Sequence, residues 1–292
     1  VDLKNLRAAI QNELHDREFG HGVRLEMPSN CPSHISDFLL SHFKITHEAL
    51  YLVEGPVNLV RLMAVPDMVD RPELKFPPYT ASTPTYLSNG RSVIQAAAKQ
   101  DILLHHPYQS FEPIVQFIRE AAHDPDVVAI KMTIYRTGSN SELVRELMAA
   151  ALAGKQITVV VELMARFDEA NNANWAQYLE DAGAHVVYGV YGYKVHAKMA
   201  LVVRREQGNL KRYAHLGTGN YHQGNSRIYT DFGLITADEH ITADVNTLFM
   251  EITGLGQPIK LNKLYQSPFT LHKMVISSIQ REIEHAKAGK PA

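Results

Sequence analysis

The fold is decided by two stretches of sequence, Val127-Val-Ala-Ile-Lys-Met-Thr-Ile-Tyr135 and Gln156-Ile-Thr-Val-Val-Val-Glu-Leu163. The first alternates and is rich in β-branched residues, which favours a strand. The second is nearly continuously apolar, as expected of a strand that a parallel sheet buries on both faces. Between them, Ser139-Asn-Ser-Glu142 has the form of a capping box and Gly154 is a typical stop, so we predict a connecting helix.

The alternation of strand and helix continues on both sides of these stretches. Helices are expected over 110–122 and 171–182, and a further strand over 185–190. Short connections between alternating strands and helices are typical of right-handed βαβ units. We therefore expect an α/β fold, with a mixed or parallel sheet flanked by helices.

A proline-rich stretch precedes this region. Five prolines lie between residues 66 and 84, which indicates an extended linker. Upstream of it, the apolar spacing predicts helices over 3–14 and 33–42. We expect three parts: a smaller α+β segment with the linker over 1–88, a main domain over 89–265, and a final helical part over 266–292.

The composition excludes several classes of protein. The 292 residues include 29 Lys and Arg against 31 Asp and Glu, with 45% hydrophobic residues, which excludes disorder and fibrous repeats. A single cysteine cannot form an internal disulfide. Apolar runs such as 157–161 are too short for a transmembrane segment, and the charged first turn does not fit a signal peptide. We expect a cytoplasmic location. Because the chain begins with valine and stops just after a helical pattern, we also expect it to be a fragment of a longer protein.

Three residues with phosphate-binding chemistry recur at constant spacing. Thirty residues separate Arg136 from Arg166, and thirty separate Arg166 from His196, about the length of one βαβ step. Parallel strands end at one edge of a sheet, so two guanidinium groups and an imidazole should converge there. Guanidinium forks suit phosphate oxygens. Alternatively, each arginine caps a helix or pairs with a surface acid.

A short motif points to phosphoryl chemistry. His196-Ala-Lys198 with the later Gly217-Thr-Gly-Asn220 resembles the motif of the phospholipase D superfamily, in which the histidine attacks phosphorus while lysine and asparagine hold phosphoryl oxygens. His285-Ala-Lys287 repeats three of these letters within a predicted amphipathic helix, and we interpret it as a coincidence. Apolar residues replace the acid that usually follows the lysine, which weakens a lipase or nuclease function.

Local charge favours a polyanionic substrate. Seven cations and a single acid lie between residues 190 and 230, in a chain of net charge -2. A solvated β-hairpin over 204–212 would account for part of this charge. Aromatic residues for base stacking are sparse there, so we expect no nucleic-acid partner.

Several longer motifs then resemble those of polyphosphate kinases. They cover about residues 90–265 and occur in the family's order: Asp101-Ile-Leu-Leu-His-His-Pro-Tyr-Gln-Ser-Phe111, Ile130-Lys-Met-Thr-Ile-Tyr-Arg136, Val161-Glu-Leu-Met-Ala-Arg-Phe-Asp-Glu169, Lys194-Val-His-Ala-Lys198, Ala214-His-Leu-Gly-Thr-Gly-Asn-Tyr221 and Arg227-Ile-Tyr-Thr-Asp231. The resemblance corresponds to the end of the family's middle domain and its first phospholipase D-like C-terminal domain. The last helix would lead toward a second C-terminal domain.

The resemblance implies reversible transfer of the terminal phosphate of ATP to inorganic polyphosphate through a phosphohistidine. His196 matches the phosphorylated nucleophile, with Lys198 and Asn220 as its catalytic neighbours. His215 is a further histidine of the site, and Tyr229 matches a tyrosine that contacts the nucleotide. The implied partners are ATP or ADP and polyphosphate, and the full-length protein is expected to be a homo-oligomer.

The resemblance also implies Mg²⁺ as a cofactor. Arg136 and Arg166 match positions that the family associates with magnesium. Because a guanidinium cannot ligate a cation, we expect both arginines to hold phosphate oxygens that magnesium bridges.

Two other functions stay open. A phospholipase D-like phosphodiesterase or phosphatidyltransferase would keep His196 and Lys198 but transfer to water or an alcohol. The isolated fragment is expected to have little kinase activity of its own. A catalytically silent polyphosphate-binding fragment, which would keep only the attraction to the polyanion, is the further alternative. Peripheral association with a membrane is an alternative to a purely cytoplasmic location.

Overall fold

The computed structural model describes residues 21–88, 90–138, 141–162, 169–190, 192–254 and 260–291. The helix predicted over 3–14 and the candidate residue Arg166 lie outside these ranges. The chain divides into two compact units, Val1–Thr80 and Ala81–Ala292, which are described separately below.

The first unit is small and contains both helix and strand. Its strands β1 (Leu25–Pro28) and β2 (Leu50–Val53) pair in parallel, and α2 (Ser33–Phe43) confirms the helix predicted over 33–42. The proline-rich stretch contains short helical turns, among them α3 (Val65–Met68), followed by irregular backbone. This unit has the expected α+β character, and it ends at Thr80 rather than at residue 88.

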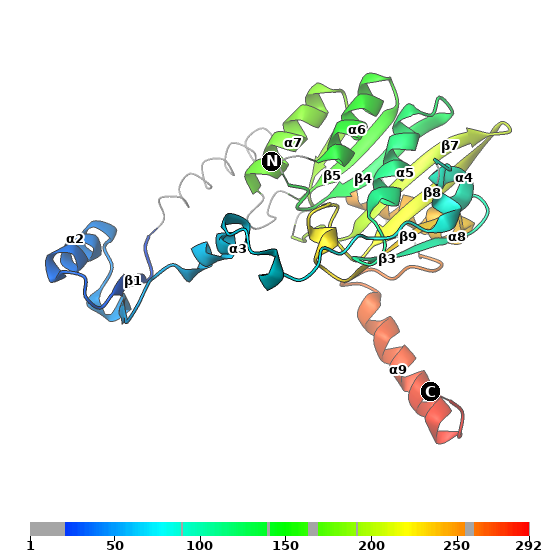
Figure 1. Ribbon diagram of the computed structural model, residues 1–292. Coiled ribbons are helices and arrows are strands. Elements are labelled where there is room, and N and C mark those ends of the chain that lie inside the picture. Colours follow the sequence, from blue (N-terminus) through cyan, green and yellow to red (C-terminus); the bar gives the residue numbers. More distant parts are fainter. Residues whose placement is uncertain are drawn as a thin grey trace. The chain divides into compact units, whose positions relative to one another are not determined.

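The second unit is built on a seven-stranded mixed sheet (Figure 1). Three neighbouring strands at one side of the sheet, the last of them an edge strand, pair in parallel, and the remaining four strands add antiparallel pairings. The order across the sheet is β3 (Ile102–His106), β9 (Asp231–Thr236), β8 (Asn209–Gly217), β7 (Lys198–Glu206), β4 (Val127–Ile134), β5 (Gln156–Val161) and β6 (His185–Tyr188). This arrangement confirms the predicted fold class.

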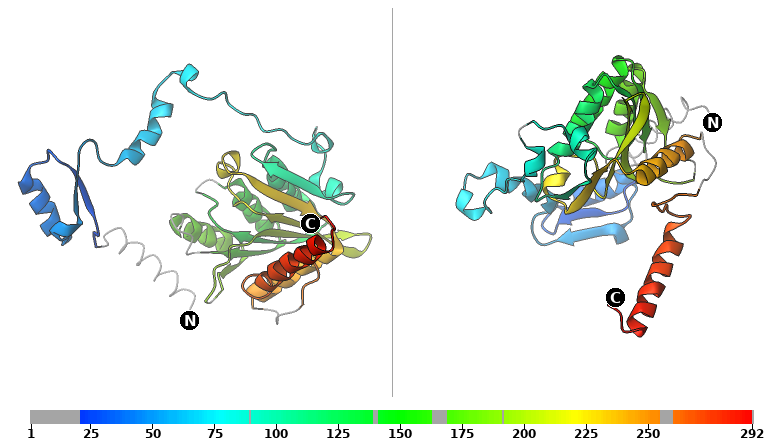
Figure 2. Two further views of the ribbon diagram at one scale, coloured as in Figure 1. Left: turned by 90° about the horizontal axis from the view of Figure 1, so that it is seen from below. Right: turned by 90° about the vertical axis from the view of Figure 1, so that its right-hand side faces the viewer.

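Helices cover both faces of the sheet. One face carries α5 (Glu112–His123), α6 (Glu142–Leu152) and α7 (Glu169–Asp181), with the short α4 (Val93–Ala97) beside α5 (Figure 1). The other face carries α8 (Glu239–Ile252), on the opposite side in Figure 2. There Val245 and Phe249 pack on Leu201 and Ala214 of the sheet. None of the described helices is long and apolar enough to cross a membrane.

The start of α6 differs from its prediction. Its N-cap is Ser141, whose Oγ accepts a hydrogen bond from the backbone N–H of Val144 at 3.4 Å. Glu142 is therefore the first helical residue rather than the third, and its carboxylate pairs with Arg119 of α5. The predicted capping box was wrong: the N-cap is Ser141, which has Val144 rather than Glu or Gln three residues later. Ser139 itself lies outside the described residues.

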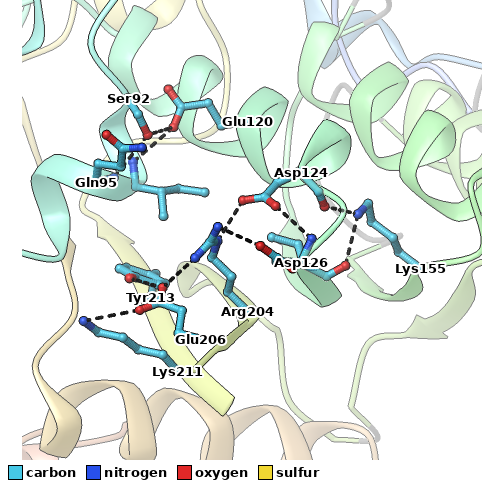
Figure 3. Close-up of polar contacts among 12 residues, drawn as sticks. Ser92, Gln95, Glu120, Asp124, Asp126, Lys155, Arg204, Glu206, Lys211 and Tyr213 are labelled. Atoms are coloured by element: carbon cyan, nitrogen blue, oxygen red, sulfur yellow. Dashed lines mark hydrogen bonds and ion pairs between the residues drawn. The ribbon is translucent and has the colours of Figure 1, made fainter. Parts of the chain in front are cut away.

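The predicted concentration of positive charge is divided by the fold. β7 and β8 form the hairpin, and Arg204 on it pairs with Asp124 and Asp126 and lies 3.2 Å from Glu206 (Figure 3). The hydroxyl of Tyr213 also donates to Glu206, at 2.6 Å. This cluster lies six residues along β7 from its first residue, or about 20 Å. Arg204 is therefore neutralised and does not contribute to a single basic surface.

One buried carboxylate attaches α8 to the segment that follows it. Asp244 is 1% exposed and accepts hydrogen bonds from the backbone N–H groups of Asn262, Lys263 and Leu264 at 2.6–2.9 Å. Burial acts to raise the pKa of Asp244, but these hydrogen bonds outweigh it and hold the pKa below its ordinary value. The ionised carboxylate is thus part of the folded structure.

Asp244→Ala should lower the free energy of unfolding by about 2–3 kcal/mol, because it leaves three backbone donors without their acceptor. Since the pKa of Asp244 is depressed on folding, its contribution is complete above the ordinary carboxyl pKa and is lost as the pH falls through the lowered pKa. Urea unfolding at pH 7 and at pH 3 measures both effects. Glu239→Ala, at an exposed position of the same helix, is the control, and equal losses in the two variants would contradict the assignment.

Candidate functional site

The central pairing of β4 with β7 brings the predicted site residues to one edge of the sheet. β4 ends at Ile134, and β7 begins beside it at Lys198 and runs antiparallel. Arg136 and His196 meet there because the end of one strand and the start of its antiparallel neighbour share an edge. The constant spacing in the sequence is not the cause, because His196 precedes an inserted antiparallel strand rather than directly following a third parallel one.

A buried threonine fixes the start of β7. The hydroxyl of Thr133 donates to the carbonyl of Ala197 at 2.7 Å and accepts from the backbone N–H of Met199 at 3.1 Å. Thr133 is 2% exposed. Its side chain therefore holds the backbone on both sides of Lys198 and helps to orient His196 and Lys198.

A buried carboxylate holds the backbone on the other side of the histidine. Glu162, directly after β5, is 4% exposed and accepts the backbone N–H of Val195 at 2.8 Å. Asn172 of α7 donates to the backbone carbonyl of Glu162 at 3.0 Å. The position of His196 is thus determined by contacts from the two neighbouring parallel strands.

His196 and Lys198 touch each other. The Nζ of Lys198 lies 3.1 Å from Nδ1 and 3.0 Å from Nε2 of the imidazole. The ring of Tyr135 packs edge-on against His196 at 4.8 Å between centroids, and its face lies 5.1 Å from the Nζ of Lys198. The aromatic ring supports both groups from one side.

The local electrostatics keep both groups prone to lose a proton. Burial, Lys198 and Arg136 lower the pKa of His196, against a smaller opposite effect of Glu162. Burial lowers the pKa of Lys198 to about 8, with Asp231 acting against the shift and Arg136 adding to it. His196 is consequently a neutral imidazole near pH 7, with a lone pair available for nucleophilic attack.

Arg136 occupies an unusual backbone conformation. Its φ of 52° lies in the left-handed region, which costs a residue with a side chain about 1 kcal/mol or more. Its Nε is buried and has no hydrogen-bond partner among the described residues. This combination presents a guanidinium with unused donor capacity to the site.

The glycine motif forms the facing wall. Thr218 donates to a carboxylate oxygen of Asp231 at 2.8 Å and accepts from the backbone N–H of Phe232 at 2.9 Å. A Cβ on Gly219 would lie only 2.4 Å from the Asp231 carboxylate, so glycine is required for this close approach. Asn220 follows directly and faces the same space.

These groups surround one cavity of about 280 Å³. The described residues that line it include six of the seven predicted site residues: Arg136, His196, Lys198, His215, Asn220 and Tyr229. The sequence analysis gave no role to four further groups, namely Thr133, Glu162, His106 and Asp231. For His106 a signal existed: alternation from Ile102 places it on the same buried face as Leu104.

The described lining does not form a magnesium site made of protein ligands. Asp231 is the carboxylate among the lining residues, and it already accepts from Thr218. A search of the described residues finds no group of three or more His, Cys, Asp or Glu side chains that could hold a metal. Arg136 cannot ligate a cation.

The comparisons with known proteins agree with this geometry. The family model of the polyphosphate kinase C-terminal domain 1 matches residues 92–258, and that of the polyphosphate kinase middle domain matches residues 1–65. The chain belongs to the polyphosphate kinase family. The resemblance inferred from the motifs is therefore confirmed.

Individual relatives support the same assignment. A polyphosphate kinase of Neisseria meningitidis serogroup C is 75% identical over 291 residues, covering 100% of this chain and 42% of the relative. One of Burkholderia cenocepacia is 55% identical, covering 100% and 43%. The crystal structure of polyphosphate kinase from Porphyromonas gingivalis matches with a TM-score of 0.78 at 32% identity, over 91% of this chain and 41% of that one. The chain thus spans less than half the length of these family members.

Lys198 should titrate near pH 8, because burial and Arg136 disfavour its charged form. After reductive ¹³C-methylation of the 292-residue chain, the NMR signal of Lys198, assigned by loss in Lys198→Arg, should show this midpoint. Added phosphate should raise the midpoint by stabilising the ammonium. A midpoint close to 10.5 without phosphate would contradict the buried position.

Thr133→Val should raise the pH midpoint at which Lys198 titrates. Without the Thr133 hydroxyl, the start of β7 is no longer held in its buried position beside Arg136, and both effects that lower the pKa of Lys198 weaken. The substitution should also cost about 1–3 kcal/mol of stability, since two hydrogen bonds are lost at nearly constant volume. Thr133→Ser retains the hydroxyl and should keep the midpoint. If Thr133→Val changed only the stability, Thr133 would have no positioning role.

Proposed function

We propose that this chain carries the phosphohistidine chemistry of a polyphosphate kinase, which transfers the terminal phosphate of ATP reversibly to inorganic polyphosphate. The observation that carries the proposal is the contact of His196 with Lys198 in a cavity that Arg136 also lines. A neutral nucleophile beside two cations suits attack on an anionic phosphorus centre. Family membership supports the same reaction.

The proposed chemistry has two displacements at phosphorus. A ring nitrogen of His196 attacks the terminal phosphorus of ATP, the N–P bond forms, the bond to the bridging oxygen breaks, and ADP leaves. A terminal oxygen of polyphosphate then attacks the same phosphorus and breaks the N–P bond. Lys198 and Arg136 offset the charge on the equatorial oxygens in both steps, and such preorganised charge supplies much of the rate in phosphoryl transfer.

The remaining site residues have narrower proposed roles. Asn220 donates to phosphoryl oxygens, and Tyr229, which is 60% exposed at the cavity, contacts the nucleotide. Arg166 binds phosphate together with Arg136. Mg²⁺ would be held by nucleotide phosphates that these arginines also contact, which agrees with the lack of a protein-ligated site in the described lining.

A silent polyphosphate-binding fragment is the second candidate, and it rests on one observation: the chain covers 42% of its Neisseria relative. Donors for the far side of the transferring phosphate would then come from outside these residues. Under this alternative, polyphosphate binds but no phosphohistidine forms.

The proposed location is cytoplasmic.

His196→Ala should abolish self-labelling by γ-³²P-ATP, because among the described residues that line the cavity His196 is the histidine in direct contact with Lys198. The label should be acid-labile and base-stable, as a phosphoramidate is. We would measure it in the 292-residue chain and in a chimera that carries this chain in place of the matching segment of the Neisseria relative.

His285→Ala is the matched control. This second His-Ala-Lys histidine lies on α9 (Leu271–Lys287), pairs with Glu282 at 3.4 Å and is not among the residues that line the cavity around His196. Label that persists in His196→Ala would move the nucleophile elsewhere. Polyphosphate binding without label in both proteins would favour the silent fragment.

A further inference from the structure

Two buried imidazoles converge beside the nucleophile. His106 ends β3 and His215 lies in β8, on either side of β9, and they are 3% and 2% exposed. A Cβ on Gly233 of β9 would lie 3.0 Å from Nε2 of His215 and 3.5 Å from Nε2 of His106. The lack of a side chain at Gly233 thus lets both Nε2 atoms, together with the side chain of Ile114, approach the same point on β9.

The hydrogen bonds of His106 determine its proton position. Its Nδ1 lies 2.8 Å from the backbone carbonyl of Gln109. A carbonyl only accepts, so Nδ1 carries the proton. Burial lowers the pKa of His106, so the ring is neutral and Nε2 presents a bare lone pair. His106 is an acceptor toward the cavity.

His215 has the opposite polarity. Its Nδ1 lies 2.7 Å from the hydroxyl of Tyr221, whose pKa burial raises well above the ordinary value. The hydroxyl has no other acceptor among the described residues, so it donates to Nδ1. Burial lowers the pKa of His215 to about 3, which leaves one ring proton, on Nε2. His215 is a donor toward the cavity.

The two Nε2 atoms have no hydrogen-bond partner among the described residues. Unsatisfied buried polar atoms cost stability, so such a pair indicates a ligand atom. A ligand atom that satisfies both rings must accept a hydrogen bond from His215 and donate one to His106, as a hydroxyl oxygen can. His106 and His215 line the same cavity as Lys198 and Arg136, whose charges favour an anion.

Among oxyanions, a phosphate that retains a proton fits all of these groups. Its P–OH can donate to His106 and accept from His215, whereas a fully ionised oxyanion such as sulfate can donate to neither ring. Asp231 also lines the cavity and disfavours a fully ionised group. The combination of two cations, one carboxylate and a donor–acceptor pair selects a protonated phosphate.

We propose that His106 and His215 form a subsite for the hydroxyl of a monoprotonated phosphate group. The identity of the natural ligand rests on the proposed function: it is the terminal phosphate of a polyphosphate or of ATP. Only a terminal group has a second, weakly acidic proton, with a pKa near about 6 in phosphate monoesters. The subsite thereby distinguishes the end of a phosphate chain from its interior.

The test compares inorganic phosphate with sulfate, which has a similar shape and no proton at pH 7. Calorimetric titration of the 292-residue chain at constant ionic strength should show phosphate bound about tenfold or more tightly than sulfate. His106→Asn retains a donor to the Gln109 carbonyl but has no group at the Nε2 position, and should abolish this preference. His106→Gln places an amide oxygen near that position and should restore part of it.

His123→Asn on α5 is the control, since this exposed imidazole pairs with Glu146 at 3.1 Å and does not line the cavity. It should leave the preference unchanged. Equal affinities for phosphate and sulfate in the unsubstituted chain would overturn the proposal even if no variant folded. A preference that persisted in a folded His106→Asn would also overturn it and reduce the pair to a site for water.

The failure of this subsite and the failure of the proposed function can be told apart by experiment. Phosphate preference without self-labelling of His196 would keep the subsite and reject the phosphohistidine reaction. Self-labelling without phosphate preference would do the reverse.

Discussion

The antiparallel pairing of β4 with β7 is the constraint on which the site depends. It joins the parallel half of the sheet to the antiparallel half and places the residues after β4 beside the residues before β7. The regular pairing ends at Met132 and Ala200, and the hydroxyl of Thr133 continues it by bonding to the backbone on both sides of Lys198. A side chain thus replaces the backbone ladder at the point where the chain must leave the sheet to present His196.

Local elements could be predicted because their signals are local. Alternation predicted β4, a continuous apolar run predicted β5, and helical spacing of apolar residues predicted the helix over 33–42 that corresponds to α2. The insertion of β7 between β8 and β4 could not be predicted, because it depends on pairings between residues that are distant in sequence. Convergence of Arg136 with His196 was therefore expected for a reason that does not hold. At the start of α6 the local pattern selected Ser139 as the N-cap, but the N-cap is Ser141, and Glu142 pairs with Arg119 of the neighbouring helix α5.

The same limit explains which site residues were missed. Motif reasoning selects residues whose chemistry is known, such as His196 and Lys198. It does not select Thr133 or Glu162, which act on backbone atoms of other strands and have no distinctive spacing. The seven cations between residues 190 and 230 show a related limit: they were expected to act together, but Arg204 is paired with acids from the α5–β4 connection and from β7 itself.

The two ends of β7 show how one strand can separate stability from function. At the far end, Arg204 has three carboxylates within salt-bridge distance, so its charge is compensated within the fold. At the near end, Lys198 is 6% exposed and, among the described residues, has no carboxylate within that distance, and burial depresses its pKa. An uncompensated buried cation is unfavourable on its own, and the phosphate proposed above would remove that penalty. The compensated far end therefore supplies stability to β7, while the near end keeps a charge that an anionic ligand can pair with.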